Sequence, residues 1–297
     1  MPLVSMKTMM RQAMAGGYAV GYFEAWGSYS LEAALEAAEE QRSPVILGFG
    51  AMMLDGVWLD HRGVELLGAI GRTITLRARV PFALLFNEAQ TLDQAQRAID
   101  AGFNAVMLDT SAWPRQRAVD TLSALVREAH SRHVTVEVEL GRLPDATATG
   151  IDMRGHALTD PADAVWFMAE TGADCLAVSI GNVHLLTTHS APVDLDRLAA
   201  IRRAVPAPLV IHGGTSFPPE CVAAAISHGV AKFNVGTVLK RAFREAAAGA
   251  IGGPDVHAVL GSHKPADCMV AGKAAMKQKI SELMRLYGSA GRADDLA

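Results

Sequence analysis

The sequence is poor in cysteine and lacks any long apolar run without charge. Its 3 cysteines, Cys175, Cys221 and Cys268, show no CxxC spacing, which argues against a disulfide framework and is typical of a reducing compartment. We interpret them as buried small apolar side chains. No stretch approaches about 18 uncharged apolar residues, so we expect no membrane-spanning helix. The N-terminal residues contain no apolar signal segment, and we expect a cytoplasmic protein.

Clusters of basic residues are also missing. The 27 Lys and Arg residues are nearly balanced by 31 Asp and Glu residues, for a formal net charge of -4. No basic run or basic patch interleaved with aromatic residues is found, so we expect neither a nucleic-acid partner nor a membrane surface. An anionic small molecule would therefore need a local binding pocket.

Short apolar runs alternate along the chain with longer helical patterns. The runs are continuous rather than alternating, which is typical of parallel strands buried on both faces. We expect eight strands, at 19–23, 45–48, 82–86, 105–108, 134–140, 175–180, 209–211 and 232–235. We expect helices at 31–41, 59–80, 92–100, 114–130, 162–171, 195–205, 219–228 and 238–248. Eight βα units predict an α/β fold, a (β/α)8 TIM barrel. The alternative is a doubly wound open sheet, although no GxGxxG follows the first strand.

Two segments lie outside this pattern. Residues 141–160 form a polar stretch after the fifth strand, which predicts a functional lid loop. Residues 266–288 predict a C-terminal helical appendage, packed on the barrel or on a partner subunit. We expect a single domain over residues 1–297.

Many polar residues stand at or near the ends of the predicted strands. In a barrel of this type the active site lies at that edge, so these side chains should converge. A packed barrel has no structural need for so many ionisable groups at one rim. They are Glu24, Asn87, Glu88, Asp109, Glu137, Glu139, Asn182, His184, His212 and Asn234.

His184 and His212 follow neighbouring strands within this polar set. Two imidazoles with a carboxylate can hold a catalytic divalent metal with an open position. A histidine taken alone is more often structural, and the prediction depends on both lying at the same rim.

Glycine turns follow the seventh and eighth strands. Gly213, Gly214 and Thr215 come directly after one strand, and Asn234, Gly236 and Thr237 end the other. Backbone amides in such turns bind anions without a basic side chain, and these loops commonly hold phosphate in TIM barrels. The alternative is two ordinary tight turns; we expect a phosphate site.

Together these motifs resemble the class II ketose-bisphosphate (fructose/tagatose-bisphosphate) aldolases over nearly the whole chain. The matching stretches include GYAV at 17–20, RSPVIL at 42–47, VEVELGRL at 136–143, LAVSIGNVH at 176–184, LVIHGG at 209–214, KFNVGT at 232–237 and GSAG at 288–291. The resemblance implies a cytoplasmic homodimer or homotetramer. It also implies a divalent metal, Zn²⁺ in the first place or Mn²⁺, and a phosphorylated sugar as substrate.

The resemblance also assigns roles to residues. His184 and His212 correspond to two zinc ligands, and Asp109 and Glu139 to auxiliary acidic positions. Gly213, Thr215, Asn234 and Thr237 correspond to the phosphate-binding loops. Where the family has an Asp-His pair on the third strand, this chain has Asn87 and Glu88.

The third-strand change alters the expected chemistry. Glu88 can complete a His2Glu metal site, but an amide such as Asn87 cannot accept and return a proton. Glu24, Glu139 and His189 remain candidates for the proton transfer. We expect a metal-dependent aldolase acting on a phosphorylated ketose, with dihydroxyacetone phosphate or a similar ketone as product. The alternative is a family member that binds a phosphosugar or catalyses a related proton transfer or isomerisation.

Overall fold

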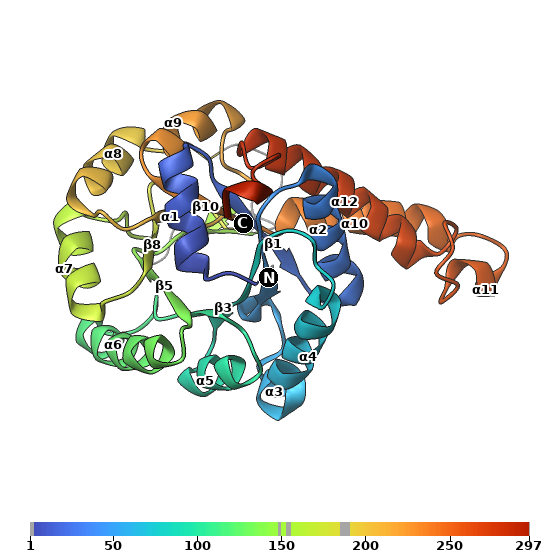
Figure 1. The fold of residues 1–297 in the computed structure, drawn as a ribbon, viewed down its shortest axis with the longest axis horizontal. Helices are drawn as coiled ribbons and strands as arrows, with labels where there is room; N and C mark the ends of the chain where they lie inside the picture. Colours follow the sequence, from blue (N-terminus) through green and yellow to red (C-terminus); the bar gives the residue numbers. More distant parts are fainter. Residues whose placement is uncertain (1–2, 148–149, 153–155, 185–190, 297) are drawn as a thin grey trace.

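The chain forms a closed barrel of parallel strands surrounded by helices (Figure 1). The computed structural model describes residues 3–147, 150–152, 156–184 and 191–296. Neighbouring strands follow the order β1-β10-β9-β8-β5-β4-β3-β2, and the predicted TIM barrel is confirmed. The barrel strands are β1 (Val20–Ala25), β2 (Val45–Gly50), β3 (Phe82–Ala89), β4 (Ala105–Leu108), β5 (Thr135–Leu140), β8 (Cys175–Val178), β9 (Leu209–Ile211) and β10 (Val230–Val235).

The helices of the outer layer follow the strands much as the sequence predicts. They are α2 (Ser28–Gln41), α4 (Val64–Thr75), α5 (Leu92–Asp100), α6 (Arg115–Ser131), α7 (Pro161–Thr171), α8 (Leu195–Ala204), α9 (Val222–Ser227) and α10 (Thr237–Ile251). The prediction of one helix over residues 59–80 is wrong at both ends. Asp55 caps a short helix α3 (Gly56–Trp58) by accepting a hydrogen bond from Trp58 N, and a π-helical turn (Leu59–Gly63) joins it to α4.

A helix that the sequence analysis did not predict closes the N-terminal end of the barrel. In α1 (Met6–Gly16), Met6, Met9, Met10 and Ala13 are fully buried. They belong to one cluster with inward-facing residues of the strands, such as Ile46. The i, i+3, i+4 spacing of these methionines is the signal that could have revealed the helix.

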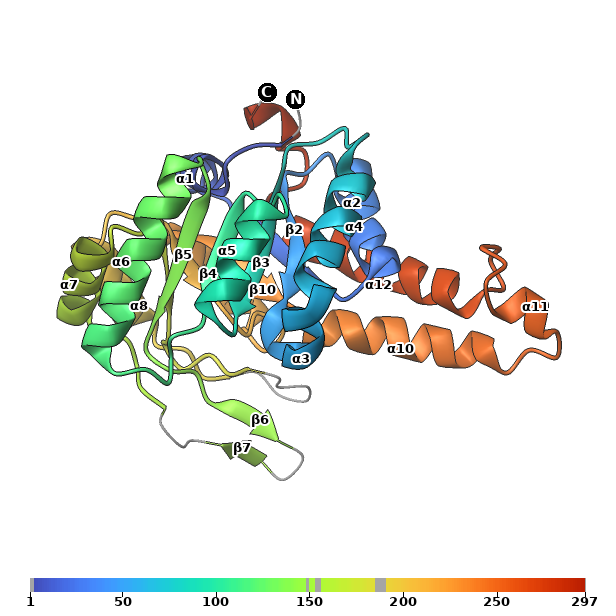
Figure 2. The ribbon, with the colours of Figure 1, turned by 90° about the horizontal axis from the view of Figure 1, so that it is seen from below.

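The polar segment at 141–160 is more structured than a loop. It contains the antiparallel strands β6 (Asp145–Thr147) and β7 (Gly150–Asp152), which the sequence pattern did not indicate. An antiparallel bridge between Arg142 and Ala157 ties its base together. Figure 2 shows this hairpin on the side of the barrel opposite α1 and the two termini, which is the side where the strands end.

The predicted C-terminal appendage is α12 (Cys268–Leu286). Its second half is part of the barrel, because Met276, Ile280 and Met284 are fully buried in the main core. Its first half runs with α10 beyond the barrel to α11 (Val256–Val259) at the tip (Figures 1 and 2). Within the described residues, every helix is too short or too polar to cross a membrane.

Candidate metal and phosphate site

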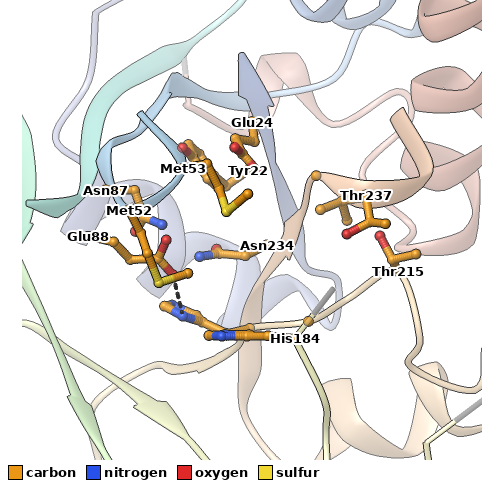
Figure 3. Close-up of a pocket in the computed structure, with 14 residues that line it drawn as sticks. Tyr22, Glu24, Met52, Met53, Asn87, Glu88, His184, Thr215, Asn234 and Thr237 are labelled. Carbon is orange, nitrogen blue, oxygen red and sulfur yellow. Dashed lines mark ion pairs between the residues drawn. The ribbon is translucent and has the colours of Figure 1, made fainter. Parts of the chain in front are cut away.

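Three side chains from different strand ends meet at the mouth of the barrel. Glu88, His184 and His212 each offer a ligand atom, and these atoms all lie within 4.8 Å of one another. The rings of His184 and His212 are stacked, with 5.9 Å between their centroids. Glu88 Oε1 lies 3.3 Å from His212 Nδ1, an ion pair drawn as a dashed line in Figure 3. Two imidazoles and one carboxylate are a donor set that suits a catalytic divalent metal.

The surroundings of His212 fit a bound cation. Its Nδ1 is buried and makes no hydrogen bond of good geometry, although Glu139 Oε2 lies only 2.9 Å away. Glu139 Oε2 is likewise buried without a hydrogen bond. His212 Nδ1 is therefore open to a bound cation, and the Glu139 carboxylate lies beside it.

The other ring nitrogen of His212 contacts a carboxylate buried inside the barrel. Glu137 Oε1 lies 2.9 Å from His212 Nε2, and Lys232 Nζ lies 2.8 Å from Glu137 Oε2. Both Glu137 and Lys232 are fully buried inside the barrel. A carboxylate that accepts from Nε2 leaves Nδ1 available as a ligand atom, as is usual for metal-bound histidines.

The charges around this group shift its pKa values strongly. Burial alone would raise the pKa of Glu137, but the Lys232 ammonium and the His212 ring lower that pKa from 4.5 to about 2. Burial alone would lower the pKa of His212, but Glu139, Glu137 and Glu88 outweigh it and raise that pKa well above 6.5. The ring is therefore surrounded by more negative charge than it can balance alone, as expected around a cation site.

A β-bulge brings the third-strand residues to the site. The pairing of β3 with β4 shifts register between Phe86 and Ala89, and Glu88 adopts a left-handed backbone with φ of 55°. Such a conformation is costly for a residue with a side chain and is concentrated at functional sites. Because of the bulge, Asn87 and Glu88 both line the cavity at the barrel mouth.

All the predicted phosphate residues except Gly214 line the same cavity. Gly213, Thr215, Asn234, Gly236 and Thr237 all contribute to its wall, and Gly214 N donates to Asn234 O at 2.8 Å. Both polar atoms of the Asn234 side chain are buried without hydrogen-bond partners. Figure 3 shows Asn234 between Glu88 on one side and Thr215 and Thr237 on the other. Thr237 begins α10, and the positive end of that helix dipole suits an anion.

The turn after β9 requires glycine. Gly213 has a φ of 66°, and a Cβ atom there would lie 2.3 Å from Val183 O. The neighbouring Asn182 fixes this region, because its Nδ2 donates to His212 O at 2.9 Å and its Oδ1 accepts from Ile180 N. Asn182 is thus placed in a supporting position behind the cavity.

Asp109 does not belong to the three-residue cluster. It lines a second cavity together with Glu88, Glu139, His184 and Arg142, and its Oδ1 accepts from Ser111 N at 2.9 Å. The two cavities share Glu88, His184 and Met52, so they meet at the metal cluster. A chain-like ligand that spans the cluster can therefore extend into both.

Glu24 also faces the cavity, on the side of the phosphate loops. Its Oε1 accepts from Lys240 Nζ at 2.6 Å. Burial raises the pKa of Glu24, and Lys240 counteracts this effect. His189, the other candidate for proton transfer, lies outside the described residues.

Several site residues were not predicted. Tyr22, Met52 and Met53 line the cavity, while Lys232 and Lys240 supply counter-charges for Glu137 and Glu24. A lysine in the middle of the apolar run at 230–235 was the visible signal for Lys232.

Comparison with known proteins decides the family. The sequence profile described as fructose-bisphosphate aldolase class-II matches residues 4–292. The chain belongs to this family. Its enzyme class is accordingly that of a class II aldolase-type lyase, and family members depend on a divalent metal and act on phosphosugars.

Solved aldolase structures share the whole fold. The YdjI aldolase from Escherichia coli K12 is 27% identical with a TM-score of 0.81, over 98% of this chain and 99% of that one. A Coccidioides immitis protein, provisionally assigned as a fructose-1,6-biphosphate aldolase, is 25% identical with a TM-score of 0.80, over 97% of each chain. The fructose-bisphosphate aldolase of Campylobacter jejuni is 21% identical with a TM-score of 0.74, over 97% of this chain and 96% of that one, which shows the fold alone.

Proposed function

We propose that this protein cleaves a phosphorylated ketose in a divalent-metal-dependent retro-aldol reaction and releases dihydroxyacetone phosphate or a similar ketone. The observation that carries the proposal is the cluster of Glu88, His184 and His212 beside a cavity lined by the two glycine turns. Nitrogen and carboxylate donors favour Zn²⁺, and the glutamate makes Mn²⁺ acceptable. When bound, the metal would polarise the ketone carbonyl of the substrate.

The phosphate loops would fix one end of the substrate. We assign the terminal phosphate to Gly213, Thr215, Gly236 and Thr237, whose turns and helix N-terminus suit an anion. Asn234, with both side-chain polar atoms buried and unpaired, would bind hydroxyl and carbonyl groups next to the phosphate. The remainder of the sugar would extend across the cluster into the cavity lined by Asp109 and Glu139.

Bond cleavage requires removal of the proton from the hydroxyl next to the broken bond. The electron pair of that bond passes to the carbonyl side, and the released ketone takes up a proton at carbon. We assign the proton transfer to Glu139, which lines the distal cavity and lies within 2.9 Å of His212. Glu24 is less suitable, because it is bound to Lys240 on the phosphate side. Asp109 would support the cluster from the distal side.

Asn87 would position the substrate rather than exchange a proton with it. Its Oδ1 is buried without a hydrogen-bond partner, and its side chain lines the cavity beside Glu88. An amide in this place can bind a substrate hydroxyl but cannot remove its proton. The replacement of the family's acid/base at this position therefore changes the proton route without removing the binding group.

Two measurements test this function. Purified protein should release dihydroxyacetone phosphate from at least one member of a panel of ketose phosphates after loading with Zn²⁺ or Mn²⁺. Glu88→Ala should abolish stoichiometric metal binding, while Glu65→Ala on the distant surface of α4 should retain it. Absence of cleavage across the panel, with phosphosugar binding intact, would instead support a binding protein or an isomerase. Protein that binds no metal would overturn the metal site.

We also propose that the protein is a homodimer or homotetramer associated through the arm of α10, α11 and α12. The arm projects from the barrel, and Ile251, Val256 and Leu260 near its tip are more than half exposed. Exposed apolar residues on a projecting element favour contact with another chain. Light scattering should show an oligomer, and Ile251→Asp together with Leu260→Asp should dissociate it.

A further inference from the structure

A carboxylate of the protein lies inside the region assigned to the substrate phosphate. Strand β1 carries Glu24 to the barrel mouth, where the side chain is 17% exposed. The carboxylate lines the same cavity as Thr215 and Thr237, and Figure 3 shows it facing that cavity. An acidic group is an unexpected component of a site for a dianion, because like charges repel strongly in a partly buried cavity.

The backbone around Glu24 is shaped to accommodate this carboxylate. A Cβ atom at Gly236 would lie 2.0 Å from Glu24 Oε2, and one at Gly50 would lie 3.1 Å from Oε1. Two glycines on either side therefore give room to the carboxylate. Gly236 is the residue immediately before α10, so Oε2 lies against the N-terminal end of that helix. The position that would attract a phosphate is thus next to a charge of the same sign.

Lys240 balances this charge from the first turns of α10. Its Nζ lies 2.6 Å from Glu24 Oε1, and its side chain is 35% exposed, so the ammonium group is not locked inside the protein. The other carboxylate of this cavity, Glu88, is directed towards His212. An entering phosphate therefore meets one nearby carboxylate that opposes it and one nearby ammonium group that favours it.

We propose that Glu24 and Lys240 determine the charge of the terminal group that this site accepts. The proposal rests on the assignment of the substrate phosphate to the loops after β9 and β10. Glu24 weakens the binding of a phosphorylated ketone relative to an unphosphorylated one, and Lys240 strengthens it. The pair thereby sets how strictly the enzyme requires a phosphate, and the two residues act with opposite signs.

The test measures binding rather than turnover. Dihydroxyacetone phosphate, inorganic phosphate and unphosphorylated dihydroxyacetone are titrated by calorimetry into the metal-loaded protein. Glu24→Gln should tighten binding of both phosphates about tenfold, equivalent to about 1.4 kcal/mol, and leave dihydroxyacetone within about twofold. Lys240→Met should weaken binding of both phosphates by a similar factor. Lys273→Met is the control, because Lys273 of α12 pairs with Glu32 and Glu36 of α2 and does not line the cavity.

A double variant distinguishes an effect of charge from misfolding. Lys240→Met leaves a partly buried carboxylate without its counter-charge, whereas Glu24→Gln with Lys240→Met removes both charges. The double variant should bind phosphate more tightly than Lys240→Met alone. Weaker phosphate binding in Glu24→Gln, or equal changes for dihydroxyacetone and its phosphate, would overturn the proposal.

The role proposed for Glu24 and Lys240 can be tested separately from the proposed lyase reaction. Opposite changes in phosphate affinity in a protein that cleaves no ketose phosphate would overturn the lyase but support this inference. Cleavage of a ketose phosphate, together with a phosphate affinity that neither substitution changes, would support the lyase and overturn this inference.

Discussion

Lys232 and Glu137 form an ion pair inside the barrel, with 2.8 Å between Lys232 Nζ and Glu137 Oε2 and no exposed surface on either side chain. The pair lies directly beneath His212, which contacts Glu137 through Nε2. Burying two charges costs free energy, so we interpret the pair as positioning His212 rather than as stabilising the fold.

Removal of Lys232 alone should strongly destabilise the folded protein. Lys232→Met should lower the free energy of unfolding by about 3–5 kcal/mol, because it leaves the Glu137 charge buried and uncompensated. Urea denaturation would measure the loss. Lys277→Met is the control: its pair with Glu40, with 2.6 Å between Lys277 Nζ and Glu40 Oε1, lies at the surface with 29% and 55% of the two side chains exposed, and its loss should cost less than about 1 kcal/mol. Equal losses in both variants would contradict the role assigned to the buried pair.

Neutralising the whole pair should separate stability from metal binding. Glu137→Gln combined with Lys232→Met should be more stable than Lys232→Met alone, since no unpaired charge remains. The same double variant should bind Zn²⁺ about 10–100-fold more weakly, because His212 loses the carboxylate that orients its ring. Competition with a chromogenic chelator would report the affinity. Unchanged zinc affinity would show that Glu137 does not orient the ligand.

Metal removal should destabilise the protein. A ligand that binds the folded state alone adds about 4 kcal/mol at a concentration 1,000 times its dissociation constant. Chelation with EDTA should therefore lower the melting temperature of the wild-type protein, and re-addition of Zn²⁺ should restore it. In Glu88→Ala neither treatment should have an effect. A chelator-sensitive Glu88→Ala protein would point to a different metal site.

Stability at acid pH should depend on Asp174. Lys7 Nζ lies 2.7 Å from Oδ1, and Val136 N donates to Oδ2 at 2.9 Å. Burial alone would raise the pKa of Asp174, but Lys7, the Val136 amide and His130 lower it below 3.8. A carboxyl group with a depressed pKa stabilises the folded state above its unfolded pKa, and this contribution is lost as pH falls through the folded pKa.

The corresponding variant is Asp174→Asn. At pH 7 it should be less stable by about 1–3 kcal/mol, because its buried partners lose a charged acceptor. The difference from wild type should shrink as the pH is lowered below 4. Asp294→Asn is the control, since Asp294 is 75% exposed and pairs with Arg42 at the surface. A difference that stays constant with pH would rule out the charge of Asp174 as its cause.

Gly236 and Glu24 should be energetically coupled. Gly236→Ala would place a Cβ atom 2.0 Å from Glu24 Oε2 and should destabilise the protein by about 1–3 kcal/mol. The same change in a Glu24→Ala background should cost much less, because the clash is gone. Denaturation of the four proteins of this cycle measures the coupling, and additive losses would contradict the contact.

Much of the fold follows from local sequence pattern. The helix at Leu92–Asp100 and the strand at Ala105–Leu108 have the bounds that the sequence predicts. Continuous apolar runs and helix caps act between close neighbours in the chain, so they can be recognised without the structure. The methionine-rich α1 was missed although Met6, Met9 and Met10 have the spacing of an apolar helix face; only the structure shows the barrel end that this face covers.

The residue types of the candidate site were also predicted from the sequence. Residues at strand ends of a TIM barrel converge at one rim, which is why His184, His212 and Glu88 could be grouped without coordinates. Their arrangement could not be predicted in the same way. The bulge at Glu88 and the supporting contact of Glu137 depend on strand register and on neighbours far away in the sequence.

The sequence by itself thus determined the barrel, the polar rim and the two glycine turns, because each arises from short-range periodicity or from position relative to a strand end. Only the tertiary structure decided the partners of the buried charges. Lys232 reaches Glu137 across 95 residues, and Lys240 reaches Glu24 across 216. Electrostatic interactions depend on distance and burial in three dimensions, and neither is encoded in the local pattern of residues.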